Sequence, residues 1–155
     1  MKFIADVMLG RLAKRMRLLG FDVLYDRTLS DNEILRLSLE QGRVILTRDT
    51  ELAARPLAAN NVFVKSDDVQ DQIRQVLATL PSDESPPPLT RCSECNHPLN
   101  AVAKQEIRDS VPHYVYDKYD AFLRCSSCRR VYWRGTHVSR MERSGMVTMK
   151  KPGHR

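Results

Sequence analysis

Four cysteines, grouped as two Cys-x-x-Cys pairs, are the side chains in this 155-residue sequence with the clearest chemistry. Cys92 and Cys95 form the first pair, and Cys125 and Cys128 form the second after 29 intervening residues. Each pair places two thiolates on one tight turn, and four thiolates complete a tetrahedral Zn²⁺ site. Because sulfur fills every position, we expect this zinc to be structural. An iron–sulfur cluster and four free thiols are less favoured alternatives, and His97 and His137 are spare candidate ligands.

Carboxylates form the second group of reactive side chains, and they fall where apolar runs end or helices are expected to begin. Capping of helix N-termini explains acids of this kind, more readily for Asp31, Asp67 and Asp68 than for Asp6 and Asp49, which directly end apolar runs. The other reading is a Mg²⁺ or Mn²⁺ site, because hard divalent ions bind carboxylate oxygens and water. Such ions activate water for phosphodiester cleavage. The candidate acids are Asp6, Asp31, Glu33, Asp49, Glu51 and Asp67.

Basic and aromatic side chains accompany both groups and are candidates for holding a nucleic-acid backbone or its bases. Arg11, Lys14, Arg15 and Arg17 follow Asp6 within three helical turns, and Arg48 precedes Asp49. An ordinary solvated helix face is the alternative for the first four. After the second cysteine pair come Arg130, Trp133 and Arg134. We expect at least one of Tyr132 and Trp133 to pack into a small core instead of binding a base.

The elements that must position these residues alternate in period. Apolar runs at 3–5, 21–25, 44–46 and 62–64 predict strands. Helical spacing predicts helices over 9–19, 30–42, 51–57 and 68–80, and Pro56 is expected to break the third of them. Ser30 and Glu33 form a capping-box pair, while Gly20 and Gly42 suit helix ends. Four strands, each followed by a helix, predict a small α/β domain with three layers, in which a parallel sheet is covered on both faces. Ligands of such sheets bind beyond the carboxyl ends of the strands, where we expect the acids to gather.

The chain divides at its only proline-rich stretch, which contains four prolines in eight residues. We expect a nuclease-like domain over residues 1–80, a linker over 81–88, a zinc ribbon over 89–140 and a basic tail over 141–155. Residues 1–80 carry 12 basic and 11 acidic side chains, whereas residues 81–155 carry 13 and 8. This imbalance favours a polyanionic partner, with nucleic acid first.

Several other classes are disfavoured. There is no Ser-His-Asp arrangement and no glycine-rich phosphate loop. No run approaches the roughly 20 apolar residues that span a bilayer. Asp6 interrupts any signal-like start. We therefore expect a cytoplasmic protein without a membrane partner, in an environment where paired cysteines bind metal in preference to forming disulfides.

Five stretches together resemble the Mut-seven C-terminal RNase domain family, a PIN-like nuclease fold fused to a zinc ribbon. The resemblance covers about residues 1–140 and rests on residues 6–14, 30–35, 46–49, 91–96 and 131–137. It implies a metal-dependent ribonuclease whose acids map to Asp6, to Asp31 with Glu33 as its rival, and to Asp49. The fourth acid maps to Glu51 or Asp67.

Two functional hypotheses follow from these observations. The first is an Mg²⁺- or Mn²⁺-dependent ribonuclease in which Asp6, Asp31 and Asp49 hold the metal and the zinc ribbon assists RNA binding. The second is a non-catalytic RNA- or ribosome-binding module in which the acids serve as caps. The RNA could be tRNA or ribosome-associated, and no residue pattern distinguishes RNA from DNA or indicates an oligomeric state.

Overall fold

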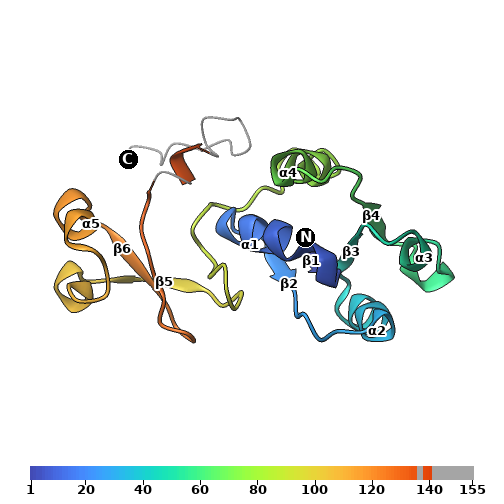
Figure 1. Cartoon of the computed structure of the whole chain (residues 1–155), viewed down its shortest axis with the longest axis horizontal. Coiled ribbons are helices and arrows are strands. Elements are labelled where there is room, and N and C mark those ends of the chain that lie inside the picture. The colour runs from blue at the N-terminus through green and yellow to red at the C-terminus, as the bar shows by residue number, and fades with distance from the viewer. Residues whose placement is uncertain (136–137, 141–155) are drawn as a thin grey trace.

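A four-stranded parallel sheet forms the centre of the first half of the chain in the computed structural model, which describes residues 1–135 and 138–140 (Figure 1). Its strands are β1 (Lys2–Ala5), β2 (Asp22–Leu24), β3 (Val44–Thr47) and β4 (Asn61–Phe63), in the order β2-β1-β3-β4. The chain moves from β1 to one side to form β2, then crosses to the other side to form β3. The strand order therefore reverses between β1 and β3, and the parallel sheet expected from the sequence is confirmed.

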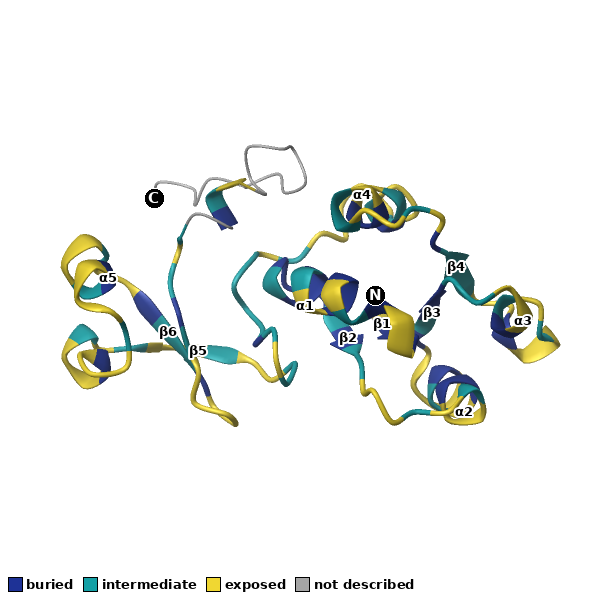
Figure 2. Cartoon of the chain, viewed as in Figure 1, coloured by how far each residue is buried: buried dark blue, intermediate teal, exposed yellow. Residues whose placement is uncertain are grey.

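Helices cover both faces of this sheet, as the strand–helix alternation predicted. One face carries α1 (Gly10–Leu18) and α4 (Val69–Leu77), and the other carries α2 (Asp31–Gln41), α3 (Thr50–Ala53) and a short 3-10 helix, η2 (Pro56–Ala58). Figure 2 shows buried positions on the inner sides of these helices and exposed positions on their outer sides. None of the described helices has the length and apolar character needed to cross a bilayer.

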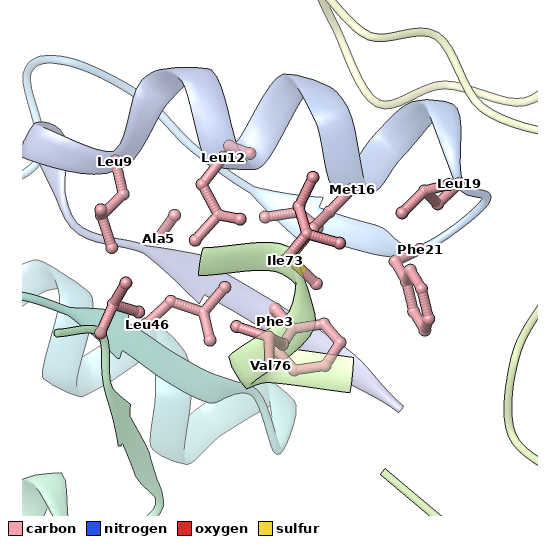
Figure 3. Packing of buried hydrophobic residues seen from close by; sticks show 13 residues of the cluster. Phe3, Ala5, Leu9, Leu12, Met16, Leu19, Phe21, Leu46, Ile73 and Val76 are labelled. Atoms are coloured by element: carbon pink, nitrogen blue, oxygen red, sulfur yellow. The ribbon is translucent and has the colours of Figure 1, made fainter. Parts of the chain in front are cut away.

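Alternation along the strands explains the two cores. Phe3 and Ala5 point toward α1 and α4, whereas Ile4, between them, points toward α2 and α3. The same division separates Leu46 from Ile45. Figure 3 shows the first core, in which apolar side chains of α1 and α4 meet those of β1 and β3. Its labelled members are Phe3, Ala5, Leu9, Leu12, Met16, Leu19, Phe21, Leu46, Ile73 and Val76.

The helix ends follow the expected chemistry, with small differences of length. The Ser30–Glu33 capping box is complete, and Gly42 ends α2 with a φ of 63°. Gly20 has a φ of 95°, and the carbonyl of Pro87 lies where a Cβ would stand.

The helix expected over 51–57 is split at Pro56 into α3 and η2, because proline cannot donate the next helical hydrogen bond. β4 ends at Phe63, so Asp67 and Asp68 lie beyond the strand and do not end it.

The second half forms a three-stranded antiparallel sheet of β5 (Leu99–Val102), β6 (Phe122–Cys125) and β7 (Val131–Tyr132). Between β5 and β6 lie a 3-10 helix, η3 (Lys104–Ile107), and a helix not expected from the sequence, α5 (His113–Lys118). They enclose a small core of Ile107, Val115 and Phe122, against which Trp133 packs.

The two halves contact each other through an interface that is rich in polar groups. The Leu89 amide donates to the Leu18 carbonyl at 2.9 Å. Asn96 accepts from the Val23 amide at 3.2 Å and donates to the Asp22 carboxylate at 2.8 Å. Residues 81–88, expected as a linker, therefore lead into a docked interface.

Asp22 gives this interface a dependence on pH. Burial raises the pKa of Asp22, but hydrogen bonds from Arg43 and Asn96 outweigh burial, and the pKa lies below its ordinary value. A lowered folded-state pKa contributes stability that is fully present above the unfolded pKa of about 4 and is lost as the pH falls through the folded value. Asp22→Asn should cost about 1–3 kcal/mol at pH 7, because Arg43 loses a charged partner, and less at pH 3.

Urea unfolding of both proteins between pH 7 and pH 3 would measure this effect. Acid also protonates cysteine ligands of a metal, so the informative quantity is the difference between wild type and variant. A stability difference that stays constant across this range would contradict the role assigned to Asp22.

Candidate functional site

Two acids lie at the ends of the two central strands, where the strand order reverses. Asp6 directly follows β1 and is only 3% exposed, and Asp49 lies two residues after β3. The fully buried hydroxyl of Thr47 donates to Asp6 Oδ2 at 2.9 Å and accepts from the Asp49 amide at 2.9 Å. Thr47 thus links the two acidic turns. Ligands of open parallel sheets bind at this position.

Both acids keep capacity to bind a cation. The Val7 amide donates to Asp6 Oδ1 at 2.6 Å, so each Asp6 oxygen accepts one protein hydrogen bond and retains a lone pair. The amides of Glu51 and Leu52 both donate to Asp49 Oδ1, which leaves Oδ2 available. Asp6 and Asp49 therefore also cap η1 (Val7–Leu9) and α3, although the sequence made capping seem the weaker explanation for them.

The other candidate acids have different partners from those expected. Asp31 pairs with Arg55 at 3.5 Å, and the N-cap of α2 is Ser30. Glu33 completes the capping box, and hydrogen bonds from the Ser30 amide and hydroxyl lower the pKa of Glu33. Asp31 is therefore not the N-cap of α2, although it lies in the first turn of that helix, where an acid is favourable. Glu51 is exposed in the first turn of α3.

Asp67 is an exposed acid that pairs with a cation. Its side chain is 89% exposed and accepts a hydrogen bond from Arg48. Asp68, and not Asp67, caps α4.

The expected gathering of five or six carboxylates at one edge is looser in the structure. Among the described residues, the cysteines are the only group of three or more potential ligands placed closely enough to hold one ion. Mg²⁺ commonly uses only one or two carboxylates and completes its shell with water and substrate phosphate. Asp6 and Asp49 fit that donor set, and Asp31 would have to exchange its partner Arg55 to join them.

Three of the predicted phosphate-binding side chains share a face of α1. Arg11, Lys14 and Arg15 line a cavity beside the first cysteine pair. Lys14 pairs with Glu94 at 3.2 Å. Arg17, expected to belong to the same basic group, is instead buried with 3% exposure.

The cysteines gather into a compact cluster that fits a tetrahedral metal. Their four Sγ atoms lie within 4.8 Å of one another, with Cys92–Cys128 at 3.6 Å and Cys95–Cys125 at 3.3 Å. Zn–S bonds of about 2.3 Å would place sulfurs about 3.8 Å apart. His97 is exposed and lies outside this cluster, with Nδ1 3.1 Å from the Cys95 carbonyl, and His137 lies outside the described residues.

The two cysteine turns have matching backbone geometry. The amide of Asn96 donates to the Cys92 carbonyl at 3.0 Å, and the amide of Arg129 donates to the Cys125 carbonyl at 3.1 Å. Asn96 and Arg129, each following the second cysteine of its pair, have φ values of 66° and 63°. The equivalence of the turns explains how two separate Cys-x-x-Cys pairs present four sulfurs to one point.

The surroundings of the sulfurs favour a bound cation. A backbone hydrogen bond from Arg130 lowers the pKa of the Cys128 thiol, but burial and the three neighbouring thiols outweigh it and raise the pKa to about 12. Four thiolates cannot share this space unless a metal neutralises them. Burial and Cys92 also raise the pKa of Tyr132 to about 12, so its hydroxyl, 3.1 Å from Cys92 Sγ, stays protonated.

Arg17 connects the cysteine cluster to the parallel sheet. Its guanidinium donates to the carbonyls of Ser93 and Glu94 at 3.0 Å each, and to the Val23 carbonyl at 2.9 Å. Burial lowers the pKa of Arg17, but a guanidinium remains charged at neutral pH. A buried cation therefore stands beside a cluster whose metal-bound form carries negative charge.

The aromatic residues near the second cysteine pair are used mainly for packing. Tyr132 is buried, and Trp133 is partly buried against Phe122, with ring centroids 6.4 Å apart. Arg130 and Arg134 are exposed. The expected basic tail, residues 141–155, lies outside the described residues.

The sequence did not identify Thr47 or Arg55 as parts of these sites, and it predicted Tyr132 only as a candidate for core packing. Thr47 lies in the 46–49 stretch that carries the family resemblance, but the sequence did not predict its hydrogen bonds to the two acidic turns. Arg17 had a detectable signal, because it lies four residues after Ala13 and beside the buried stripe of α1. The pairing of Arg55 with Asp31 had none, because it depends on tertiary structure.

Comparison with known proteins identifies one family. A family model described as Mut7-C RNAse domain matches residues 1–144. No curated protein and no solved structure matches the chain. The match confirms the resemblance carried by the five sequence stretches, and the description of the family indicates an RNA-related nuclease function.

Proposed function

The chain belongs to the Mut7-C RNAse domain family, and on this premise we propose that it is an Mg²⁺- or Mn²⁺-dependent ribonuclease that cleaves RNA phosphodiester bonds. The observation that best supports this proposal is the linkage of Asp6 and Asp49 through Thr47 at the strand-order reversal. A buried carboxylate at that position has lone pairs to spare and faces the end of the sheet where ligands bind.

In this proposal, Asp6 and Asp49 hold the divalent ion, with Asp31 as the third ligand. The other three candidate acids are less suited to binding the ion. Glu33 completes a cap, Glu51 is exposed, and Asp67 pairs with Arg48. The ion supplies activation of the attacking water and stabilisation of the leaving oxygen. Thr47 fixes the orientation of the Asp6 carboxylate, while Arg11, Lys14, Arg15 and Arg48 hold the phosphates.

The cysteine cluster has a separate role in the proposal. Cys92, Cys95, Cys125 and Cys128 hold a structural Zn²⁺, which completes a zinc ribbon too small to fold on its own core. The ribbon contributes to RNA binding through exposed Arg130 and Arg134, whereas Trp133 mainly supports the small core.

The proposal predicts cleavage of single-stranded RNA by zinc-loaded protein when Mg²⁺ or Mn²⁺ is added, and none when both are omitted. Metal omission is preferable to chelation, because a strong chelator would also remove zinc. Gel analysis of labelled RNA measures the rate, and matched DNA tests the preference for RNA. Absence of cleavage of every RNA tested with either ion would contradict the proposal.

A second candidate function is a non-catalytic RNA-binding module, including one that binds tRNA or the ribosome. The observation in its favour is that Asp6 and Asp49 both cap helices, which gives them a structural use without a metal. RNA binding without divalent-ion-dependent cleavage would support this alternative.

A further inference from the structure

A cavity of about 310 Å³ opens where α1, the start of α4 and the first cysteine turn meet. It is lined by Arg11, Lys14, Arg15, Leu18, Val69 and Ser93. Figure 1 shows the chain after α4 passing beside α1, which brings the second half of the sequence to this place. The cavity therefore combines residues from both halves of the protein.

The wall formed by α1 is a continuous stripe. Positions 11, 14, 15 and 18 recur at helical spacing and lie on one face, over a length of about 10 Å. This stripe begins one turn after Asp6 and ends beside the cysteine cluster. A nucleic-acid strand lying along this stripe would pass from the candidate catalytic acids toward the cysteine cluster.

The opposite wall is held in place by the cysteine turn. The Ser93 amide donates to the Tyr132 hydroxyl at 3.1 Å, and the Ser93 carbonyl accepts from Arg17 at 3.0 Å. Ser93 is thus fixed both by Tyr132, which also contacts Cys92, and by Arg17 of α1. These hydrogen bonds fix the position of this wall relative to α1.

The charges around the cavity favour an anion. Three cations line it, and Arg11 is exposed with no hydrogen bond or ion pair among the described residues. Glu94, on the cysteine turn, pairs with Lys14. At the start of α4, Asp68 caps the helix and Asp71 pairs with Arg74. Glu94 therefore offsets the charge of Lys14, whereas Arg11 keeps its charge without such a partner among the described residues.

We propose that this cavity binds a backbone phosphate of single-stranded RNA next to the bond being cleaved, so that the cysteine turn forms one wall of the RNA path. This inference rests on the proposed function for its choice of RNA. The inference also gives Glu94 a role. Its carboxylate competes with the RNA phosphate for Lys14 and so lowers the affinity of the protein for RNA.

RNA binding by zinc-loaded Asp6→Asn protein tests the inference without cleavage. Anisotropy of a fluorescent single-stranded RNA would measure Kd for added Arg11→Gln and Glu94→Gln changes. Arg11→Gln should weaken binding about five- to tenfold and reduce the salt dependence of log Kd by about 0.7, the contribution of one phosphate contact. Glu94→Gln should tighten binding by about threefold, because Lys14 is released.

The ion pair of Arg36 with Glu40 on α2, on the other side of the sheet, provides matched controls. Arg36→Gln and Glu40→Gln should leave Kd within about twofold of the parent protein. If Arg11→Gln weakens binding no more than Arg36→Gln, or Glu94→Gln tightens it no more than Glu40→Gln, the inference is overturned. If wild type proves unable to cleave RNA but these shifts occur, the cavity is still supported and only the nuclease proposal fails.

Discussion

Replacing Asp6 by asparagine is expected to lower the rate of RNA cleavage by about 10³-fold, a loss typical of removing one group that stabilises a transition state. The amide has the shape of the carboxylate and can keep contacts with the Val7 amide and the Thr47 hydroxyl. It cannot supply the negative charge that the proposed Mg²⁺ or Mn²⁺ ion requires. Initial rates with labelled single-stranded RNA would measure the effect.

Asp68→Asn is the matched control for this substitution. Asp68 also follows a strand, β4, and also caps a helix, but it is exposed and has no bond to Thr47. Asparagine caps helices about as well as aspartate, so stability and cleavage should both be preserved. Thermal unfolding of both variants would verify that the fold is intact. A folded Asp6→Asn protein that cleaved RNA at the wild-type rate would refute the assignment.

Loss of the proposed zinc should destabilise both halves of the chain, including residues far from the cysteines. Cys128 is the most exposed of the four, so Cys128→Ser removes a ligand with little change in packing. Without the metal, the carbonyls of Ser93 and Glu94 are no longer held toward Arg17. Loss of two of the three acceptors of this buried guanidinium should cost about 1.5–3 kcal/mol for each hydrogen bond.

Hydrogen exchange would locate this destabilisation. In Cys128→Ser, amides in α1 and β2 should exchange faster than in zinc-loaded wild type, while those in α2 should change least. Arg17→Met supplies the control, because it removes the buried charge that links the halves. In the Arg17→Met background, Cys128→Ser should affect α1 and β2 much less. Unchanged exchange in α1 and β2 of the zinc-free protein would show that the halves are independent.

Local sequence patterns were sufficient to predict most of the first half. The alternation of Phe3, Ile4 and Ala5, the Ser30–Glu33 cap and the two helix-ending glycines each depend on residues a few positions apart. The four-cysteine cluster followed from ligand spacing alone. These features depend on neighbouring residues or on the number and spacing of the cysteines, so they can be predicted without knowledge of tertiary contacts.

The features that the sequence did not predict depend on contacts between distant residues. Arg17 contacts Ser93 across 76 positions, and no local pattern assigns a helical arginine to a cysteine turn. Likewise, Arg48 neutralises Asp67 and Arg55 neutralises Asp31 through tertiary pairing. The candidate catalytic edge consequently has fewer unpaired carboxylates than the count of acids implied, with Asp6 and Asp49 as its centre.

Binding of Mn²⁺ to zinc-loaded protein is the most direct measurement of the central claim, which places a divalent ion at Asp6 and Asp49. Electron paramagnetic resonance reports free Mn²⁺ and so gives the affinity and the number of ions bound. The account predicts a Mn²⁺ site in wild type that is lost in Asp6→Asn and kept in Asp68→Asn. Equal Mn²⁺ binding by wild type and Asp6→Asn, or none by wild type, would contradict it.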